Sequence, residues 1–193
     1  FIVTGSGKGI GKGIVRCFVK AGAKCTINCN SNRAMAEETL KEIQAIGGED
    51  CAFLYQADVS DYAQAEAMAK ATYDHFGRID GLVNNAALQK QWMLDEYPIK
   101  DYDLLMHVNL GGYINMMRAV LPYLKETRGS ITCISSVHGK RPTDFDPVYA
   151  MTKGGMHMLL REAAIEFAKY GVRVNMIMPA GVKIEFKTGN PRP

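Results

Sequence analysis

The chain has 193 residues, of which 47% are hydrophobic and 22% charged, a composition typical of a globular protein with one sizeable core. The net charge is only +3 and the lysines and arginines are scattered, so nucleic acid is not an expected partner. No apolar run approaches the roughly 20 residues of a membrane-spanning helix, and the five cysteines and four histidines are too dispersed to predict a metal site, so we expect a cytoplasmic protein with free thiols.

The first predicted element is a short buried strand over residues 1–4. It begins inside an apolar run, so we expect the chain to be a fragment. The strand leads into TGSGKGIG (residues 4–11) and then into a helix whose predicted inner face carries Ile10, Ile14 and Phe18. A strand, a glycine loop and a helix together present backbone N–H groups and a positive helix end to a pyrophosphate. Nucleotide contacts are therefore predicted from Gly5, Ser6, Lys8, Gly9, Ile10 and Gly11, the alternative being a plain glycine-rich turn.

A second strand is predicted over residues 25–29. At its exit, where an acidic residue would bind the ribose 2′-hydroxyl of NAD, the sequence has none. Lys8, Ser31 and Arg33 offer positive charge and donors for a 2′-phosphate instead, and Asn30 lies in the same segment. NADP(H) is thus predicted over NAD(H), which stays the alternative. These polar residues could equally serve only to cap the next helix.

The next elements are a helix over residues 32–46, a strand over 51–59, a helix from about 61 to 76 and a strand over 79–83. At the end of the third strand, Asp58 and Val59 either approach an adenine ring or only organise the following turn. After the fourth strand, Asn85, Ala86 and Ala87 leave room for a flat ring, although two asparagines alone signal only a turn.

A long loop over residues 88–100 is predicted to form a rim, and a helix follows over 101–125. Asn109 is unfavourable in the middle of that helix, so it either faces solvent or has a function. The fifth strand is predicted over 130–137, with Ser136 near its end.

After a loop over 138–147, Tyr149 and Lys153 lie four residues apart in a helix that runs to about 170, so both occupy one face. A phenol has a pKa of about 10, and a nearby ammonium is expected to lower it enough for proton transfer. This spacing also occurs by chance in many helices. A sixth strand is predicted over 172–178 and is followed by Pro179, Gly181 and Val182.

Six strands that alternate with helices predict an α/β fold, a doubly wound parallel Rossmann-type sheet flanked by helices in a single domain over residues 1–193. Ligands of such sheets bind beyond the carboxyl ends of the strands. Five of the candidates follow strand ends and should therefore meet at one edge: the glycine loop, Asp58, the Asn84-Asn85 pair, Ser136 and Pro179.

These motifs resemble the short-chain dehydrogenase/reductase family over essentially the whole chain. TGSGKGIG matches its cofactor loop, Asn84-Asn85-Ala86 its NNAG motif, and Tyr149-xxx-Lys153 its signature. Asn109 falls at the position of its helix asparagine, and Ser136 precedes Tyr149 by the usual 13 residues. The resemblance implies an NAD(P)-binding Rossmann domain that lacks its last strand and helix here, so that both ends are incomplete.

The resemblance also implies the roles of the catalytic residues. Tyr149 would be the general acid/base, Lys153 would lower its pKa and bind the nicotinamide ribose, Ser136 would bind the reacting oxygen, and Asn109 would hold a water. Pro179, Gly181 and Val182 would contact the cofactor. Two departures are that Ala180 replaces a glycine and that Ile184 stands where a threonine usually binds the carboxamide.

Within the family, the chain is most similar to glucose 1-dehydrogenases and then to 3-oxoacyl-thioester reductases. Arg141, Asp144 and Asp146 favour a polar substrate such as a sugar or polyol, with His138 and Arg141 as candidate contacts, unless these are merely solvated loop charges. The expected protein is an NADP-dependent oxidoreductase that forms dimers or tetramers when full length; a catalytically silent nucleotide-binding scaffold is the competing hypothesis.

Overall fold

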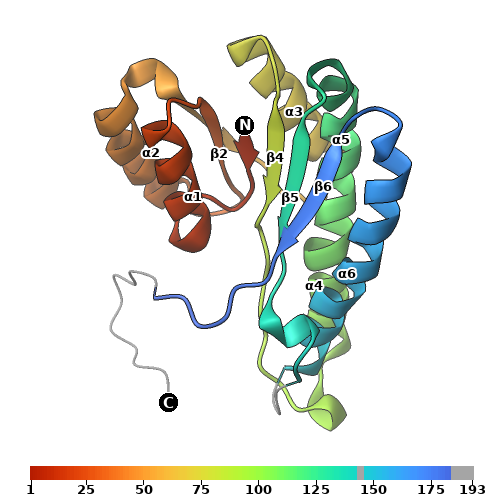
Figure 1. Ribbon diagram of the computed structural model, residues 1–193. Coiled ribbons are helices and arrows are strands. Elements are labelled where there is room, and N and C mark those ends of the chain that lie inside the picture. Colours follow the sequence, from red (N-terminus) through yellow and green to blue (C-terminus); the bar gives the residue numbers. More distant parts are fainter. Residues whose placement is uncertain (143–145, 184–193) are drawn as a thin grey trace.

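The computed structural model describes residues 1–142 and 146–183. Its centre is a parallel sheet in which six strands follow the order β3-β2-β1-β4-β5-β6 (Figure 1). This is the order of a doubly wound dinucleotide-binding fold, whose direction reverses between β1 and β4. The predicted fold class is therefore confirmed.

The helices and strands lie close to the predicted positions. The strands are β1 (Ile2–Val3), β2 (Cys25–Cys29), β3 (Ala52–Gln56), β4 (Gly81–Asn84), β5 (Ser130–Ile134) and β6 (Arg173–Ile177). The α-helices are α1 (Gly9–Lys20), α2 (Arg33–Gly47), α3 (Tyr62–Phe76), α4 (Ile99–Met106), α5 (Gly112–Thr127) and α6 (Pro147–Ala168). Short turns of helix are η1 (Glu49–Cys51), η2 (Leu94–Glu96), η3 (His107–Gly111) and η4 (Val137–Gly139).

Helices cover both faces of the sheet, and successive strand residues point to opposite faces. Ile2 and Leu82 belong to a core with α3, α5 and α6, whereas Val3 and Val83 belong to a core with α1 and α2. Figure 1 shows these two helical layers on either side of the strands. Burial on both faces explains why the central strands read as continuous apolar runs.

Among the differences from the expected elements are two boundaries and one helix face, each with a local reason. The third strand ends at Gln56 because Asp58 already forms the next turn, accepting hydrogen bonds from the Ser60 N–H and hydroxyl. The predicted helix over 101–125 is divided into α4 and α5 by the π-helical turn η3, which contains Asn109. On α1 the fully buried residues are Gly11, Val15 and Val19, while the predicted Ile14 and Phe18 only flank this face.

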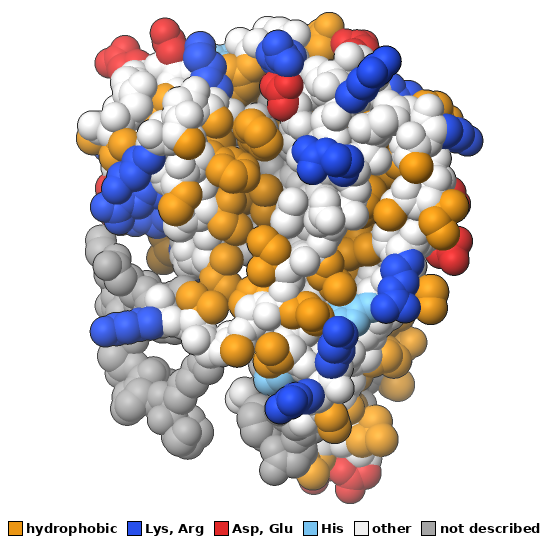
Figure 2. All heavy atoms as spheres, viewed as in Figure 1, with side chains coloured by type: hydrophobic (Ala, Val, Ile, Leu, Met, Phe, Trp, Pro, Cys, Tyr) orange, Lys and Arg blue, Asp and Glu red, His pale blue; other side chains and the backbone are white. Residues whose placement is uncertain are grey.

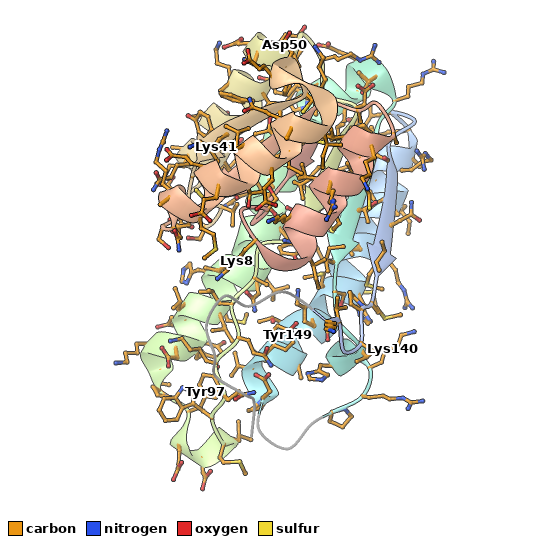
Figure 3. All side chains as sticks on the ribbon, turned by 90° about the vertical axis from the view of Figure 1, so that its left-hand side faces the viewer. Lys8, Lys41, Asp50, Tyr97, Lys140 and Tyr149 are labelled. Carbon is orange, nitrogen blue, oxygen red and sulfur yellow. The ribbon has the colours of Figure 1, made fainter. Side chains whose placement is uncertain are left out.

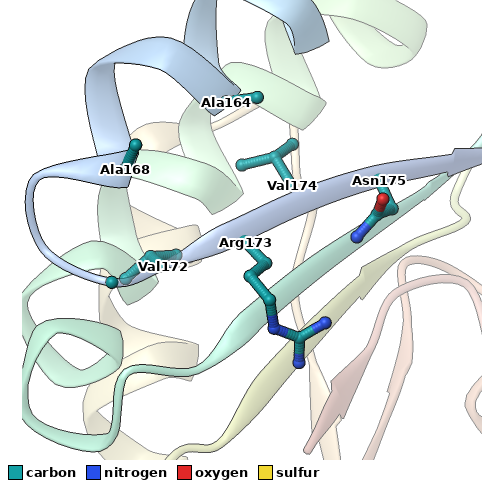
Figure 4. Close-up of a pocket in the computed structure, with 7 residues that line it drawn as sticks. Ala164, Ala168, Val172, Arg173, Val174 and Asn175 are labelled. Carbon is teal, nitrogen blue, oxygen red and sulfur yellow. The ribbon is translucent and has the colours of Figure 1, made fainter.

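The strand β6 lies at one edge of the sheet, and its side chains alternate between partly buried and exposed. In the view of Figure 2, hydrophobic side chains gather in a band left of the centre of the molecule, between the layer of α1 and α2 and the strand β6. A hollow of about 550 Å³ is lined by the end of α6 and the first half of β6 (Figure 4). It lies at the start of β6, away from the carboxyl ends of the strands, and Arg173 is its one ionisable lining residue among those described.

Two sets of residues discussed above lie outside the described parts of the chain. They are Asp144 in the loop before α6, and the segment from Ile184 onward. Within residues 1–142 and 146–183, no helix is both long enough and apolar enough to cross a membrane.

Candidate active site

The glycine loop between β1 and α1 is packed so tightly that side chains would not fit. A Cβ atom on Gly5 would lie 2.9 Å from the Cα of Ala86, and one on Gly11 would lie 2.7 Å from the amide nitrogen of Asn85. Gly5 and Gly9 also have positive φ angles of 59° and 57°, which glycine adopts without strain. The loop therefore forms a bare backbone cradle at the start of a helix, which fits the pyrophosphate of a dinucleotide.

Side chains behind the loop fix its shape. The Asn85 amide donates to the carbonyl oxygens of Thr4 at 2.9 Å and Gly5 at 3.2 Å, and the Thr4 hydroxyl accepts from the Asn85 and Ala86 N–H groups. Asn85 thus links the ends of β1 and β4, as expected of an amide at this position. The Ser6 hydroxyl is fully buried and donates to the Val3 carbonyl, so only the backbone of Ser6 could face a ligand.

Beyond β2, the predicted ribose-side residues lie at the surface. Lys8 is exposed at the N-terminus of α1, whereas Arg33 is paired with Glu37 at 2.8 Å. The Asn30 amide donates to Asp58 at 3.1 Å, so the Asp58 carboxylate is engaged on both oxygens. The turn-forming role that the sequence left open for Asp58 is therefore confirmed.

Asn32 caps the N-terminus of α2, because its side chain accepts a hydrogen bond from the N–H of Met35 at 3.1 Å. The polar residues after β2 therefore include a helix cap, as the alternative interpretation expected. Val59 is buried beneath α5: a Cβ atom on Gly112 would lie 2.7 Å from its side chain. Val59 is thus a packing residue in this structure.

Tyr149, Lys153 and Ser136 come together at the carboxyl end of the sheet. Lys153 is 2% exposed, and its ammonium donates to the Ile134 carbonyl at 2.7 Å and to the Tyr113 hydroxyl at 3.4 Å. The same ammonium lies 5.6 Å from the centre of the Tyr149 ring. In Figure 3, Tyr149 lies below Lys8, toward the same end of the molecule as Tyr97 and Lys140.

The electrostatic relation between Tyr149 and Lys153 differs from the expected one. Burial raises the pKa of Tyr149, a hydrogen bond with Ser136 opposes this change, and the charge of Asp146 adds to it. Burial lowers the pKa of Lys153 to about 8. The prediction that Lys153 lowers the Tyr149 pKa is therefore not what the structure gives, because both groups are desolvated and the ammonium is directed at Ile134 and Tyr113.

Asn109 is completely buried in the π-helical turn. Its side chain accepts from the Leu88 N–H at 2.8 Å and donates to the Leu88 carbonyl at 2.9 Å and to the Thr152 hydroxyl at 3.2 Å. Of the two alternatives for Asn109, solvent exposure is wrong. Its amide fastens the loop after β4 to the turn of α6 that carries Lys153.

The predicted rim loop is held over α4 and α6 by side-chain contacts. Trp92 donates to Asp101 at 2.9 Å, and Gln89 donates to the buried carboxylate of Asp146, the residue just before α6. Of the two candidate substrate residues, His138 lies edge-on to Tyr149 with 6.0 Å between ring centres, whereas Arg141 is exposed.

A contact between η4 and α6 was not predicted. The Ser135 hydroxyl lies 3.2 Å from the Lys153 carbonyl and 3.0 Å from Nε2 of His157. A Cβ atom on Gly139 would lie 2.8 Å from the Lys153 carbonyl, and one on Gly154 would lie 3.4 Å from the Gly139 carbonyl. This close packing requires a glycine at 139, whereas a Cβ atom at 154 would come only to the edge of ordinary contact distance. The signal for His157 was its position four residues after Lys153, on the same helix face.

A pocket of about 190 Å³ joins the glycine cradle to Ser136, Tyr149 and Lys153. Its lining comprises Ile10, Asn85, Ala87, Ile134, Ser135, Ser136, Tyr149, Lys153, Pro179 and Ala180. The lining combines small and apolar residues on one side with a hydroxyl, a phenol and an ammonium on the other, which suits a flat ring beside a reacting oxygen. Gly181 and Val182 follow Pro179 and are exposed.

Comparison with known proteins places this geometry in a family. Residues 1–191 match the family model described as short chain dehydrogenase. Glucose 1-dehydrogenase 2 of Bacillus subtilis is 34% identical over 187 residues, covering 95% of this chain and 72% of that protein. A 3-oxoacyl-acyl-carrier-protein reductase of Staphylococcus aureus is 32% identical over 179 residues, covering 92% and 72%.

Among solved structures, the crystal structure of levodione reductase superposes with a TM-score of 0.88 at 32% identity, covering 93% of this chain and 70% of that one. The sheet order, the glycine cradle and the grouping of Ser136, Tyr149 and Lys153 agree with these matches. The chain therefore belongs to the short-chain dehydrogenase/reductase family of NAD(P)-dependent oxidoreductases.

Proposed function

We propose that this chain is the nucleotide-binding and catalytic domain of an NADP-dependent enzyme that interconverts a carbonyl group and a secondary alcohol on a polar substrate such as a sugar or polyol. The observation that carries the proposal is the convergence of Ser136, Tyr149 and Lys153 on one pocket that opens toward the glycine cradle. In this reaction the bound nicotinamide supplies or accepts the hydride.

The protein groups would handle the proton. Burial keeps the Tyr149 phenol protonated at neutral pH, so it is suited to donate a proton to a carbonyl oxygen. The Ser136 hydroxyl, which lines the same pocket as the phenol, would hold the same oxygen. Lys153, fixed by Ile134 and Tyr113, would place positive charge behind the phenol as its proton leaves and would hold the nicotinamide ribose. Asn109 would keep the Lys153 turn in register and hold a water.

The cofactor contacts are proposed from the cradle and its surroundings. Gly5, Ser6, Gly9, Ile10 and Gly11 would meet the pyrophosphate through the backbone. Lys8, Asn30, Ser31 and Arg33 would surround the 2′-phosphate. Asp58 and the backbone of Val59, whose side chain is packed beneath α5, would border the adenine. Asn85, Ala86, Ala87, Pro179, Gly181 and Val182 would border the nicotinamide half.

Lys8 supports the choice of NADP(H) over NAD(H), because it is an exposed cation at the mouth of the cradle. Cytoplasmic location and assembly into dimers or tetramers complete the proposal.

The test is NADPH oxidation with a panel of sugars, simple ketones and an acetoacetyl thioester, with wild type compared to Tyr149→Phe. We expect the substitution to reduce kcat by about 10²- to 10⁴-fold, the range for loss of a general acid, while NADPH binding changes little. An unchanged rate would refute the catalytic assignment. Turnover of only the acetoacetyl thioester would favour the 3-oxoacyl-thioester reductase alternative, and NADPH binding without any turnover would favour the silent scaffold.

A further inference from the structure

A buried carboxylate next to Tyr149 has one oxygen that the described residues leave unpaired. Asp146 is 0% exposed, and Gln89 donates to its Oδ2 atom. Within residues 1–142 and 146–183, its Oδ1 atom has no hydrogen-bond partner, and neither has the buried Nδ1 atom of His138. Buried polar atoms are nearly always hydrogen-bonded, so two unpaired atoms close to a catalytic residue call for a partner.

Helix capping does not explain the Asp146 side chain. Asp146 occupies the N-cap position of α6, yet its carboxylate accepts no hydrogen bond from the first turn of that helix. Asn32 and Asp61, at the N-caps of α2 and α3, do accept such bonds. The carboxylate of Asp146 is used differently: its one described bond joins it to the rim loop.

The unpaired atoms lie beside the reacting group. Asp146 is the N-cap residue of α6 and precedes Tyr149 by three residues. The His138 ring is edge-on to Tyr149 at 6.0 Å. Burial raises the pKa of Asp146, and the bond from Gln89 and the charge of His138 oppose this change. The charge of Asp146 in turn adds to the rise that burial causes in the pKa of Tyr149, as expected for neighbouring groups.

We propose that Asp146 determines substrate specificity by accepting, at Oδ1, a hydrogen bond from a hydroxyl group one or two carbons away from the carbonyl that Tyr149 protonates. His138 Nδ1 makes the second contact to that hydroxyl. A carboxylate can only accept hydrogen bonds, so the site favours a hydroxyketone over a plain ketone, which leaves Oδ1 unpaired, and over a diketone, which offers no donor. The inference rests on the proposed reaction and specifies its substrate class.

The test compares 3-hydroxy-2-butanone, 2-butanone and 2,3-butanedione as substrates of wild type with NADPH. A site built to bind a hydroxyl group discriminates strongly against an analogue that lacks it, so we expect kcat/KM for the hydroxyketone to exceed that for 2-butanone by at least about tenfold. The hydroxyketone should also be preferred to the diketone.

The decisive variant is Asp146→Asn. Gln89 donates to the position of Oδ2, so the asparagine oxygen stays there and its NH₂ group takes the place of Oδ1, turning an acceptor into a donor. The ratio of kcat/KM for hydroxyketone over diketone should then fall by at least about tenfold. Asp61→Asn, at the N-cap of α3, is the matched control and should leave this ratio at the wild-type value.

Thermal melting and NADPH binding establish that Asp146→Asn is folded. If it is not, His138→Phe removes the second contact and should lower the same ratio. Wild type that reduces ketones without discrimination, or an Asp146→Asn ratio equal to wild type, overturns the inference and leaves the proposed function standing. The latter result would mean that Asp146 binds only water. Wild type that binds NADPH but reduces none of the three ketones overturns the inference too, and the reaction class is then decided by the wider panel.

Discussion

The amino group of Lys153 is buried, and it donates hydrogen bonds to the Ile134 carbonyl and the Tyr113 hydroxyl. Burial lowers its pKa from 10.5 to about 8. The folded state therefore disfavours the charged form, and below pH 8 this lowers the free energy of unfolding by about 3 kcal/mol. Between pH 8 and 10.5 the unfolded chain binds the proton that the folded chain has lost, so this contribution makes stability rise with pH.

We predict that Lys153→Met removes this rise. The difference in unfolding free energy, variant minus wild type, should decrease by about 2–3 kcal/mol between pH 7 and pH 10, as measured by urea denaturation. The test is how this difference changes with pH and not its size at one pH. The variant also leaves the Ile134 carbonyl without its donor, which lowers stability at every pH. Lys41→Met, at an exposed position, is the control. A constant difference for Lys153→Met would contradict the pKa assigned to this lysine.

At the scale of elements, the junction of β5, η4 and α6 holds the proposed catalytic residues in position relative to one another. Ser136 begins η4, Lys153 lies in α6, and the Ser135 hydroxyl between them contacts both the Lys153 carbonyl and His157. Burial and the charges of Lys140 and Arg161 lower the pKa of His157, so a neutral imidazole is expected at pH 7. Because Ser135 has one proton for two partners, it can donate to Lys153 while Nε2–H of His157 donates to it.

We predict that His157→Leu and Ser135→Ala each reduce kcat by about two- to tenfold, the value of one net hydrogen bond, with little change in KM for NADPH. The double variant should be no slower than the slower single variant, since both break one network. His157→Gln, which keeps an N–H donor, should restore most of the rate. His107→Leu is the control, because His107 is exposed and its ring contacts only the Asp103 carbonyl of the preceding helix, α4, among the described hydrogen bonds. Additive effects, or no rescue by glutamine, would indicate that His157 serves packing alone.

The sequence predicted the features that depend on residues close together in the chain. It did not predict the features that depend on contacts between distant segments. The glycines at 5, 9 and 11 and the Tyr149–Lys153 spacing have local signatures, so their places were predictable. Asn109 was recognised as out of place in a helix, but the π-helical turn that aims its amide at Leu88 and Thr152 comes from packing between distant segments. The pKa direction of Tyr149 was missed because burial, which composition does not reveal, has the largest effect, and because the Lys153 ammonium is directed at Ile134 and Tyr113.

At the scale of the whole molecule, the parallel sheet explains why the residues of the site lie together at one edge. Every strand of this sheet runs the same way, so the residues after β1, β2, β4, β5 and β6 meet at one end (Figure 1). The edge location was predictable from strand order alone. The side-chain links across it, such as Gln89 to Asp146, join segments far apart in the sequence and could not be predicted without the fold.

The cofactor preference is a property of this assembled edge, and binding should be visible as stability. A ligand at one hundred times its Kd stabilises by about 2.7 kcal/mol, which for a chain of this size raises Tm by about 5–10 °C. We predict that NADPH raises Tm more than NADH does at equal concentration. Lys8→Ala should weaken NADPH binding about tenfold, and Arg33→Ala less, because Glu37 already pairs with Arg33. Neither change should affect NADH binding.

Lys20→Ala, at the other end of α1, is the control. An NADH shift as large as the NADPH shift, or wild-type NADPH shifts in both variants, would show that positive charge near the cradle does not select the cofactor.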